Sequence, residues 1–202
     1  MDKTPTPRIV LDLHEKLLSR FTALFSKGVV VEARTGCTLR EFVCEQLRVP
    51  EEYLEQRIQT IFLNGKAVDD YATAIVTDGA SLALSAAMPG LVGAVFRRGG
   101  FYAGLRNTVT HQSDGSAACA MAGSVTVKLF NLTVKEIGPL MLKNGVRVGG
   151  KDLQGLLVQF ADDFQSGCRQ ALLDDQPISL DKLTGRLATF DQVDLRISES
   201  SD

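Results

Sequence analysis

The segment from Ser26 to Val43, SKGVVVEARTGCTLREFV, and the segment from Lys143 to Leu157, KNGVRVGGKDLQGLL, share one order of residue types. In each, a polar and basic pair is followed by glycine, by a valine-rich stretch, by a second glycine and by an apolar periodic run. Valine favours strands, and glycine is typical of turns. The two segments therefore predict a strand, a turn and a helix, repeated about 117 positions apart, from Gly28 to Gly145.

The similarity continues after the two predicted helices. Ile58–Val68 and Arg169–Ile178 each read as a strand, a polar turn and a second strand. Asn64-Gly65 is a strong signal for a type I′ hairpin, because both residues tolerate positive φ. Each half then closes with an alternating strand, Ser81–Ser85 in the first and Val193–Ile197 in the second, so one face of each strand is expected to be buried.

Each half also opens with a stretch that reads as a hairpin, Arg8–Val31 in the first and Ser124–Val148 in the second. Each half is thus predicted to be ββαββ, with one main helix against a mixed four-stranded sheet, which is an α+β fold. One alternative stays open in the first half. His14–Phe25 can be helical, because Leu17, Leu18, Phe21, Leu24 and Phe25 recur with a helical period.

Helix starts and core positions are predicted as well. Thr38 and Asp152 are good N-caps, and Glu41, three residues after Thr38, completes a capping box. The second helix carries an apolar stripe of Leu153, Leu156, Leu157, Phe160 and Phe164. The other residues expected in the core are Val29, Val31, Phe42, Ile61, Leu63, Leu82, Leu84, Val146, Val148, Leu172, Leu195 and Ile197.

This pattern resembles the β-grasp fold of ubiquitin, and within it the sulfur carriers, namely the small subunit of molybdopterin synthase and the thiamine-pathway carrier. The resemblance is carried by Gly36-Cys37-Thr38-Leu39-Arg40-Glu41-Phe42, by Leu63-Asn64-Gly65-Lys66 and by Asp78-Gly79-Ala80-Ser81-Leu82-Ala83-Leu84. It implies tandem β-grasp (ubiquitin-like) domains: a first domain at 1–88, a glycine-rich arm and linker at 89–123, and a second β-grasp-like domain at 124–202 with a short acidic tail.

The sequence departs from the sulfur carriers at the position that does their chemistry. A sulfur carrier works through a flexible Gly-Gly terminus, whose carboxylate becomes a thiocarboxylate. Here the corresponding segment, Met88–Ala94, is followed by about one hundred further residues, and the chain ends in the acidic, serine-rich Ser198–Asp202. The resemblance therefore implies the fold of the family without its reaction.

The arm combines glycine with aromatic and basic residues. Gly90, Gly93, Gly99, Gly100 and Gly104 alternate with apolar side chains, and arginines stand beside aromatic rings. Guanidinium groups stack on rings and bind carboxylates, so this composition is typical of a contact surface. The residues expected to bind a partner are Arg97, Arg98, Gly99, Gly100, Phe101, Tyr102 and Arg106.

Two alternatives for the arm remain open. Phe96, Phe101 and Tyr102 can instead cover a sheet edge or pack between the halves. The arm can also be the hidden end of a carrier precursor, activated by cleavage after Gly93 or Gly100. If it is a contact surface, replacing Arg97 and Arg98 with Glu is expected to leave stability nearly unchanged and to abolish capture of the partner.

Composition excludes several classes of function. The formal charge of −2 gives no overall field toward nucleic acid or an anionic membrane, and the first residues do not form a secretory signal. The four cysteines form no C-x-x-C pair, so reduced thiols and a cytoplasmic location are expected. His14 and His111 each stand alone, and Asp162-Asp163 and Asp174-Asp175 fit a solvated helix face and a turn.

These observations predict a non-enzymatic protein-interaction module with no catalytic residues, cofactor or metal. Its partner is expected to be a protein, or a second copy of the chain bound through the arm, and not nucleic acid or a membrane.

Overall fold

A computed structural model describes residues 6–87, 90–101 and 121–199, and it confirms an α+β fold of helices and mixed sheet. The chain divides into two compact units. Met1–Val29 and Pro139–Asp202 form the first, called unit 1 below, and Val30–Gly138 forms the second, called unit 2.

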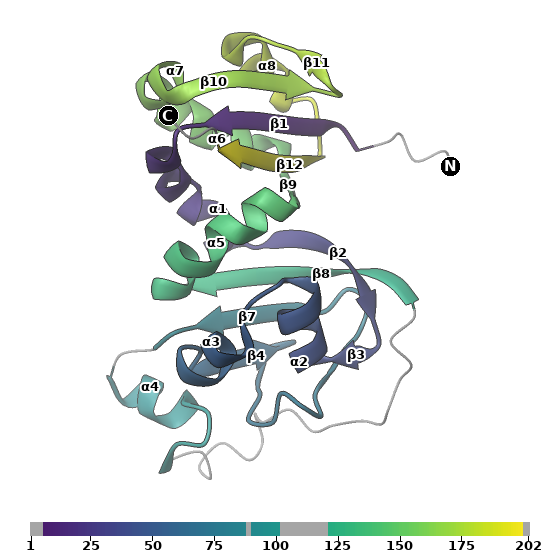
Figure 1. The fold of residues 1–202 in the computed structure, drawn as a ribbon, viewed down its shortest axis with the longest axis vertical. Coiled ribbons are helices and arrows are strands. Elements are labelled where there is room, and N and C mark those ends of the chain that lie inside the picture. The colour runs from purple at the N-terminus through teal and green to yellow at the C-terminus, as the bar shows by residue number, and fades with distance from the viewer. Residues whose placement is uncertain (1–5, 88–89, 102–120, 200–202) are drawn as a thin grey trace. The chain divides into compact units, whose positions relative to one another are not determined.

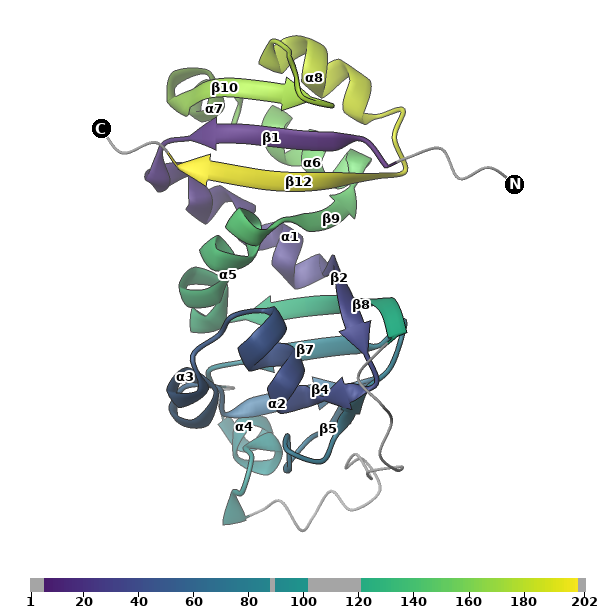
Figure 2. The same cartoon turned by 45° about the vertical axis from the view of Figure 1, so that its right-hand side comes forward.

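Unit 1 contains five sheet strands in the order β11-β10-β1-β12-β9. Its strands are β1 (Arg8–Leu13), β9 (Val146–Gly149), β10 (Cys168–Leu173), β11 (Gln176–Pro177) and β12 (Gln192–Glu199). Its helices are the 3-10 helix η1 (Glu15–Phe21), α1 (Thr22–Lys27), α6 (Gly150–Gln159), α7 (Ala161–Gly167) and α8 (Leu180–Leu187). In Figures 1 and 2, α6 and α7 lie on one face of this sheet.

Unit 2 contains five sheet strands in the order β2-β8-β7-β4-β5 and a small separate sheet of β3 and β6. Its strands are β2 (Val29–Thr35), β3 (Cys37–Thr38), β4 (Thr60–Leu63), β5 (Lys66–Ala67), β6 (Ile75–Val76), β7 (Ser81–Ser85) and β8 (Met121–Phe130). Its helices are α2 (Leu39–Glu41), the π-helix η2 (Phe42–Gln46), α3 (Glu51–Gln56) and α4 (Gly90–Phe96). Figure 2 shows α2 and α3 over one face of the larger sheet. The helix α5 (Leu132–Asn144) begins in unit 2 and ends in unit 1.

A parallel pair of strands forms the centre of each sheet. In unit 2, β7 pairs with β8 so that Leu82 lies opposite Val127. In unit 1, β1 pairs with β12 so that Ile9 lies opposite Leu195. All four side chains are fully buried. Alternation of apolar and polar residues along these strands therefore places the core at the centre of each sheet.

The two units differ in which strand of the central parallel pair lies beside the β4–β5 or β10–β11 hairpin. In unit 2 the closing strand of the first half, β7, pairs antiparallel with β4. In unit 1 the strand beside β10 is β1, from the start of the chain, and the closing strand β12 pairs with β9 instead. Each unit thus takes one central strand from the other half of the sequence. The units consequently divide the chain differently from the continuous domains predicted at 1–88 and 124–202.

The prediction that both halves open with a hairpin is wrong. A helical segment separates β1 from β2, and α5 separates β8 from β9. The helical alternative for His14–Phe25 is the one confirmed, since Leu17, Phe21, Leu24 and Phe25 are all buried. Val134, Ile137, Met141 and Leu142 are likewise buried at helical intervals in α5, although that helix contains Pro139. In both segments the helical period of the apolar residues therefore predicts the structure better than the hairpin turn suggested by Gly28 and Gly145.

Several local predictions are confirmed. Asn64 and Gly65 both have positive φ, 52° and 77°, at the β4–β5 turn. Thr38 and Glu41 form the capping box. Asp152, however, is not an N-cap, because α6 begins at Gly150 with Gly149 as its cap. Of the predicted core, all positions are buried except Val31, Leu172 and Phe160, which are half-buried.

Candidate functional site

The arm, as far as the structure describes it, lies beside the start of β4 in unit 2. The α4 helix ends at Phe96, whose ring lies 5.2 Å from that of Phe62 between centroids. Two residues later, the backbone N–H of Arg98 donates to the carbonyl of Gln59, with a nitrogen to oxygen distance of 2.8 Å. The arm thereby binds the residue that directly precedes β4, outside the Phe62–Leu63 stretch that pairs with β5.

Arg98 anchors the arm to its own unit. Its Nη2 donates to the carbonyl oxygens of Leu54 and Glu55, at 3.2 and 2.9 Å. The guanidinium carbon lies 4.6 Å from the centroid of the Tyr71 ring, within the range of a cation–π interaction. Arg98 was predicted to face a partner, yet these contacts hold its side chain inside unit 2.

The Tyr71 side chain suits this role. Burial raises the pKa of its phenol, and the neighbouring Glu55 carboxylate raises it further. The hydroxyl therefore stays protonated at neutral pH, and the neutral ring presents its face to Arg98. The Nη1 of Arg98 is buried and has no hydrogen-bond partner among the described residues. Leaving such a donor unsatisfied opposes docking, so the other contacts of Arg98 have to outweigh its cost.

Arg97 makes a more exposed contact. Its Nε and Nη2 both donate to Oε1 of Gln59, at 3.0 and 2.7 Å. Gln59 therefore binds the arm twice, through its carbonyl to Arg98 and through its side chain to Arg97. Sequence reasoning missed Gln59 and Tyr71, because they stand about 27 to 38 positions from the arm and carry no motif of their own.

The two glycines after Arg98 turn the chain outward. Gly99 has a φ of +62°, in the left-handed region that favours glycine, and its N–H lies 3.4 Å from Oδ1 of Asp69. The next side chain, Phe101, is 94% exposed. The predicted residues Tyr102 and Arg106 lie outside the described residues. Of the predicted binding residues, the structure thus brings Arg97 to Phe101 together at one edge of unit 2.

The two predicted cleavage positions differ in surroundings. Gly93 lies inside α4, where it is buried, and its carbonyl accepts from the N–H of Arg97. Gly100 follows the anchored Arg98 directly. A carrier terminus has to be flexible enough to enter an activating enzyme, so the contacts of Arg98 oppose that role for the intact chain.

The carboxylates and histidine set aside in the sequence make structural contacts. Asp163 pairs with Arg20 at 2.8 Å, and Oδ1 of Asp174 accepts from the N–H of Arg8. His14 caps η1 through Nδ1. Within the described residues no group of three His, Cys, Asp or Glu side chains is placed to hold a metal ion.

The described cysteines, Cys37, Cys44 and Cys168, form no disulfide, and Cys119 lies outside the described residues. Burial raises the pKa of the Cys44 and Cys168 thiols. The thiol form, which is a poor nucleophile, is therefore favoured at both positions.

Comparison with protein-family models, with curated proteins and with solved structures finds no match to this chain. Nor does the described part of the chain contain a helix of the length and apolar character needed to cross a membrane.

Proposed function

We propose that the chain is a non-enzymatic, cytoplasmic protein-interaction module of tandem β-grasp type, which binds a protein partner through exposed sheet surface and through the arm at 89–111. The strand orders support the β-grasp part of the proposal. A ββαββ chain whose last strand inserts beside its first gives a parallel central pair with antiparallel neighbours. In unit 1 the parallel pair β1–β12 has antiparallel neighbours on both sides, and in unit 2 the parallel pair β7–β8 has β4 antiparallel beside it. In each unit one strand of the central pair comes from the other half of the sequence.

The binding proposal rests on the change in solvent exposure between Arg98 and Phe101. Arg98 is fixed to unit 2 by two carbonyls and an aromatic ring, whereas Phe101, three residues later, is 94% exposed. A short, anchored connection holds an exposed aromatic side chain close to one place. Aromatic anchors of this kind dominate the energetics of many interfaces, because they bury a large apolar area at small entropic cost.

The alternative is a carrier precursor activated by cleavage after Gly93 or Gly100. It has less structural support, because Gly93 is buried in α4 and Arg98 restrains the segment before Gly100. The intact mass of protein purified from its host separates the two proposals. A measured mass that corresponds to a chain ending at Gly93 or Gly100 would refute the binding-module proposal and support the carrier precursor.

The test of the binding proposal is photo-crosslinking from position 101. p-Benzoylphenylalanine replaces Phe101 in one protein, and in a matched control it replaces Val158, another exposed apolar residue at 61% exposure. We expect a crosslink to one host protein from position 101 alone, and competition by excess wild-type protein but not by Phe101→Asp. The same products from both positions would refute arm-specific binding. A crosslinked pair of chains would assign the arm to self-association.

A further inference from the structure

Unit 2 has an apolar corner where β8 ends and α5 begins. In the described part of the chain five large apolar side chains are exposed, and two of them, Phe130 at 36% and Leu132 at 48%, are separated by a single residue. Phe130 is the last residue of β8, and Leu132 is the first of α5. Single exposed apolar residues are ordinary, whereas adjacent ones are typical of contact surfaces. These two residues are called the corner below.

Hydrogen bonds hold the backbone of the corner in place. Asn131 has a φ of 58°, and its Nδ2 donates to the Ser85 hydroxyl at 2.8 Å and to the Ala87 carbonyl at 2.5 Å. Thr133 is fully buried, and its hydroxyl accepts from the N–H of Phe130 at 3.1 Å. The corner is therefore already ordered, and a partner that binds there has little backbone entropy to remove.

A lysine lies beside each apolar residue of the corner. Lys128 is on the same face of β8 as Phe130, because side chains alternate along a strand and the intervening Leu129 is buried. Lys135 follows Leu132 by three residues in α5, which places both on one side of the helix. Within the described residues, neither lysine has a carboxylate at ion-pair distance.

The acidic residue next to Lys135 in the chain does not neutralise it. Glu136 accepts hydrogen bonds from the hydroxyl of Tyr53 and from Nη2 of Arg57, the latter at 2.6 Å. These bonds lower the pKa of Glu136, so its carboxyl group stays ionised, and the charge of Arg57 balances it. The charges of Lys128 and Lys135 thus remain available to the acids of a partner.

The corner lies at the same end of the unit 2 strands as the docked arm. Thr60 lies opposite Ser85 in the register, and Ser85 lies opposite Phe130. Gln59, to which the arm is bonded, directly precedes Thr60. Since neighbouring strands are about 4.8 Å apart, Phe130 and Thr60 are separated by about 10 Å across the sheet. One partner of ordinary interface size can therefore contact both the corner and the arm.

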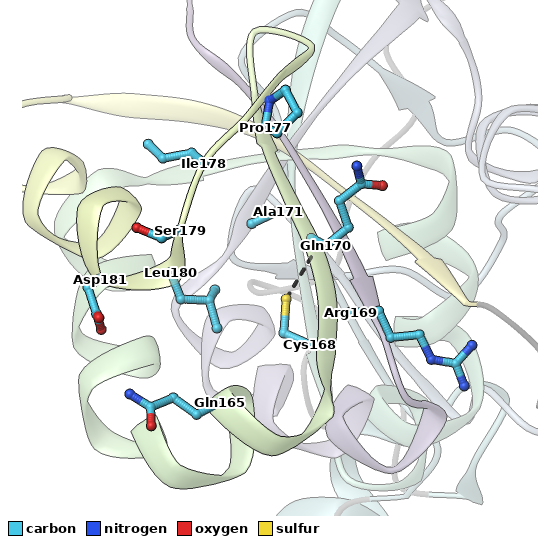
Figure 3. A pocket seen from close by; sticks show the side chains of 10 residues that line it. All are labelled: Gln165, Cys168, Arg169, Gln170, Ala171, Pro177, Ile178, Ser179, Leu180 and Asp181. Carbon is cyan, nitrogen blue, oxygen red and sulfur yellow. Dashed lines mark hydrogen bonds between the residues drawn. The ribbon is translucent and has the colours of Figure 1, made fainter.

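The hollow of unit 1 lacks this combination of groups. It has a volume of about 650 Å³ and lies between β10 and the segment that leads into α8 (Figure 3). Figure 3 shows Leu180 directed toward Cys168 across the hollow. The cation among the lining residues is Arg169, and its side chain is directed away from Leu180. The hollow thus does not present a cation beside its apolar side chains, whereas the corner presents two.

We propose that the corner binds an acidic segment of the partner protein. A large apolar residue of that segment packs on Phe130 and Leu132, and carboxylates on either side of it pair with Lys128 and Lys135. The inference rests on the proposed protein-binding function, and it gives the chemistry of the partner at a second contact beside the arm. Apolar anchors supply most of the affinity of such a contact, and the charges around them supply selectivity.

An acidic protein segment suits the corner better than an anionic membrane or a nucleic acid. Recognition of anionic lipids takes clusters of about four to eight cations, and nucleic acids are held by many phosphate contacts. The corner offers two lysines, and the formal net charge of −2 gives the chain no overall attraction to either polyanion. A short peptide with a few carboxylates matches both the number of cations and the apolar pair.

The test is an NMR titration of the full chain with two blocked octapeptides, GEELFEEG and GQQLFQQG, which differ only in charge. We expect the acidic peptide to bind about tenfold more tightly, the effect of two exposed ion pairs, and to shift the amide signals of residues 128–135. The double variant Lys128→Gln and Lys135→Gln should remove this preference. The matched control, Lys151→Gln and Lys182→Gln, changes two exposed lysines of α6 and α8 in unit 1 and should retain it.

A second variant tests the apolar contact. Leu132→Gln changes an exposed position of a helix, so the fold is expected to persist, and an unchanged amide signal of the buried Thr133 would verify this. Both peptides should bind about fivefold more weakly, because part of a leucine contact is lost, while the ratio of their affinities stays the same.

Several results would overturn the proposal. Equal affinities of the two peptides, or a preference that survives in the double lysine variant, would remove the lysines from the site. Shifts that spare residues 128–135 would place the peptides elsewhere. Shifts at 128–135 that grow with protein concentration in the absence of peptide would make a second copy of the chain the occupant. Binding to phosphatidylserine vesicles that is lost in the double lysine variant would assign the corner to a membrane.

The corner and the arm can fail independently. The crosslinking experiment from position 101 reports on the arm, and none of the lysine or leucine variants changes an arm residue. A crosslink from position 101 without peptide binding at 128–135 would refute the corner alone, and the reverse result would refute the arm alone.

Discussion

Replacing Arg98 with Ala tests whether this residue anchors the arm. The change removes two hydrogen bonds from a charged donor and a cation–π contact. At about 1.5 kcal/mol for each bond and about 0.5 kcal/mol for the ring contact, the sum is about 3.5 kcal/mol. The side chain is half-buried and its Nη1 is already unsatisfied, so we expect a net loss of about 2 kcal/mol in docking. That loss corresponds to an arm that opens about 30 times more often.

Hydrogen exchange of the amide at position 98 measures this opening, because that N–H is bonded to the Gln59 carbonyl at 2.8 Å. We expect its protection to fall about 30-fold in Arg98→Ala, as calculated above. The matched control is Arg97→Ala, which removes an exposed contact with a side chain and is expected to change protection about twofold. Equal effects of the two variants, or unchanged exchange in Arg98→Ala, would refute the assignment of Arg98 as the anchor. The structure also changes the expectation for the double Glu variant, which should now lose local stability.

Two further predictions concern burial and pH. Leu173 is 4% exposed and Leu172 is half-buried, so Leu173→Ala should lower the free energy of unfolding by about 2 to 5 kcal/mol and Leu172→Ala by about 1 kcal/mol in urea titrations. A Leu172 variant as damaging as the Leu173 variant would contradict the observed strand register. Hydrogen bonds from the backbone and side chain of Thr38 lower the pKa of Glu41, so its stabilising effect is present above the unfolded pKa and is lost as pH falls through the folded pKa. Glu41→Gln should therefore lower Tm at pH 7 and have little effect at about pH 2, whereas an equal loss at both would count against the capping box.

Features set by neighbouring residues could be predicted from the sequence. The Asn64-Gly65 turn and the box of Thr38 and Glu41 depend on contacts within a few positions, so the local residues determine them. Leu172 was predicted to be a core residue from its hydrophobicity, and that prediction was wrong. The turn at Asp174-Asp175 fixes the register of β10, and the alternation then points Ala171 and Leu173 inward despite the greater hydrophobicity of Leu172 over Ala171.

The exchange of strands and the docking of the arm could not be predicted in this way. β1 and β12 both alternate apolar and polar residues, so their local sequences do not indicate which of them pairs with β10. Likewise, nothing in the sequence near Arg98 indicates that its guanidinium binds Leu54 and Glu55. Both outcomes depend on contacts between residues far apart in the chain, for which a single sequence gives no signal.

The exchanged strands also impose an order on folding during synthesis. Unit 2 lacks a central strand until the ribosome has released β8, which ends at Phe130, although its other strands are complete by Ser85. β1 ends at Leu13, yet its partners β10 and β12 begin only at Cys168 and Gln192, so they are synthesised much later. A nascent chain therefore carries the apolar face of Ile9, Leu11 and Leu13 without its native cover until β10 and β12 have been synthesised. A chaperone that binds the emerging N-terminal segment would have most to protect in that interval.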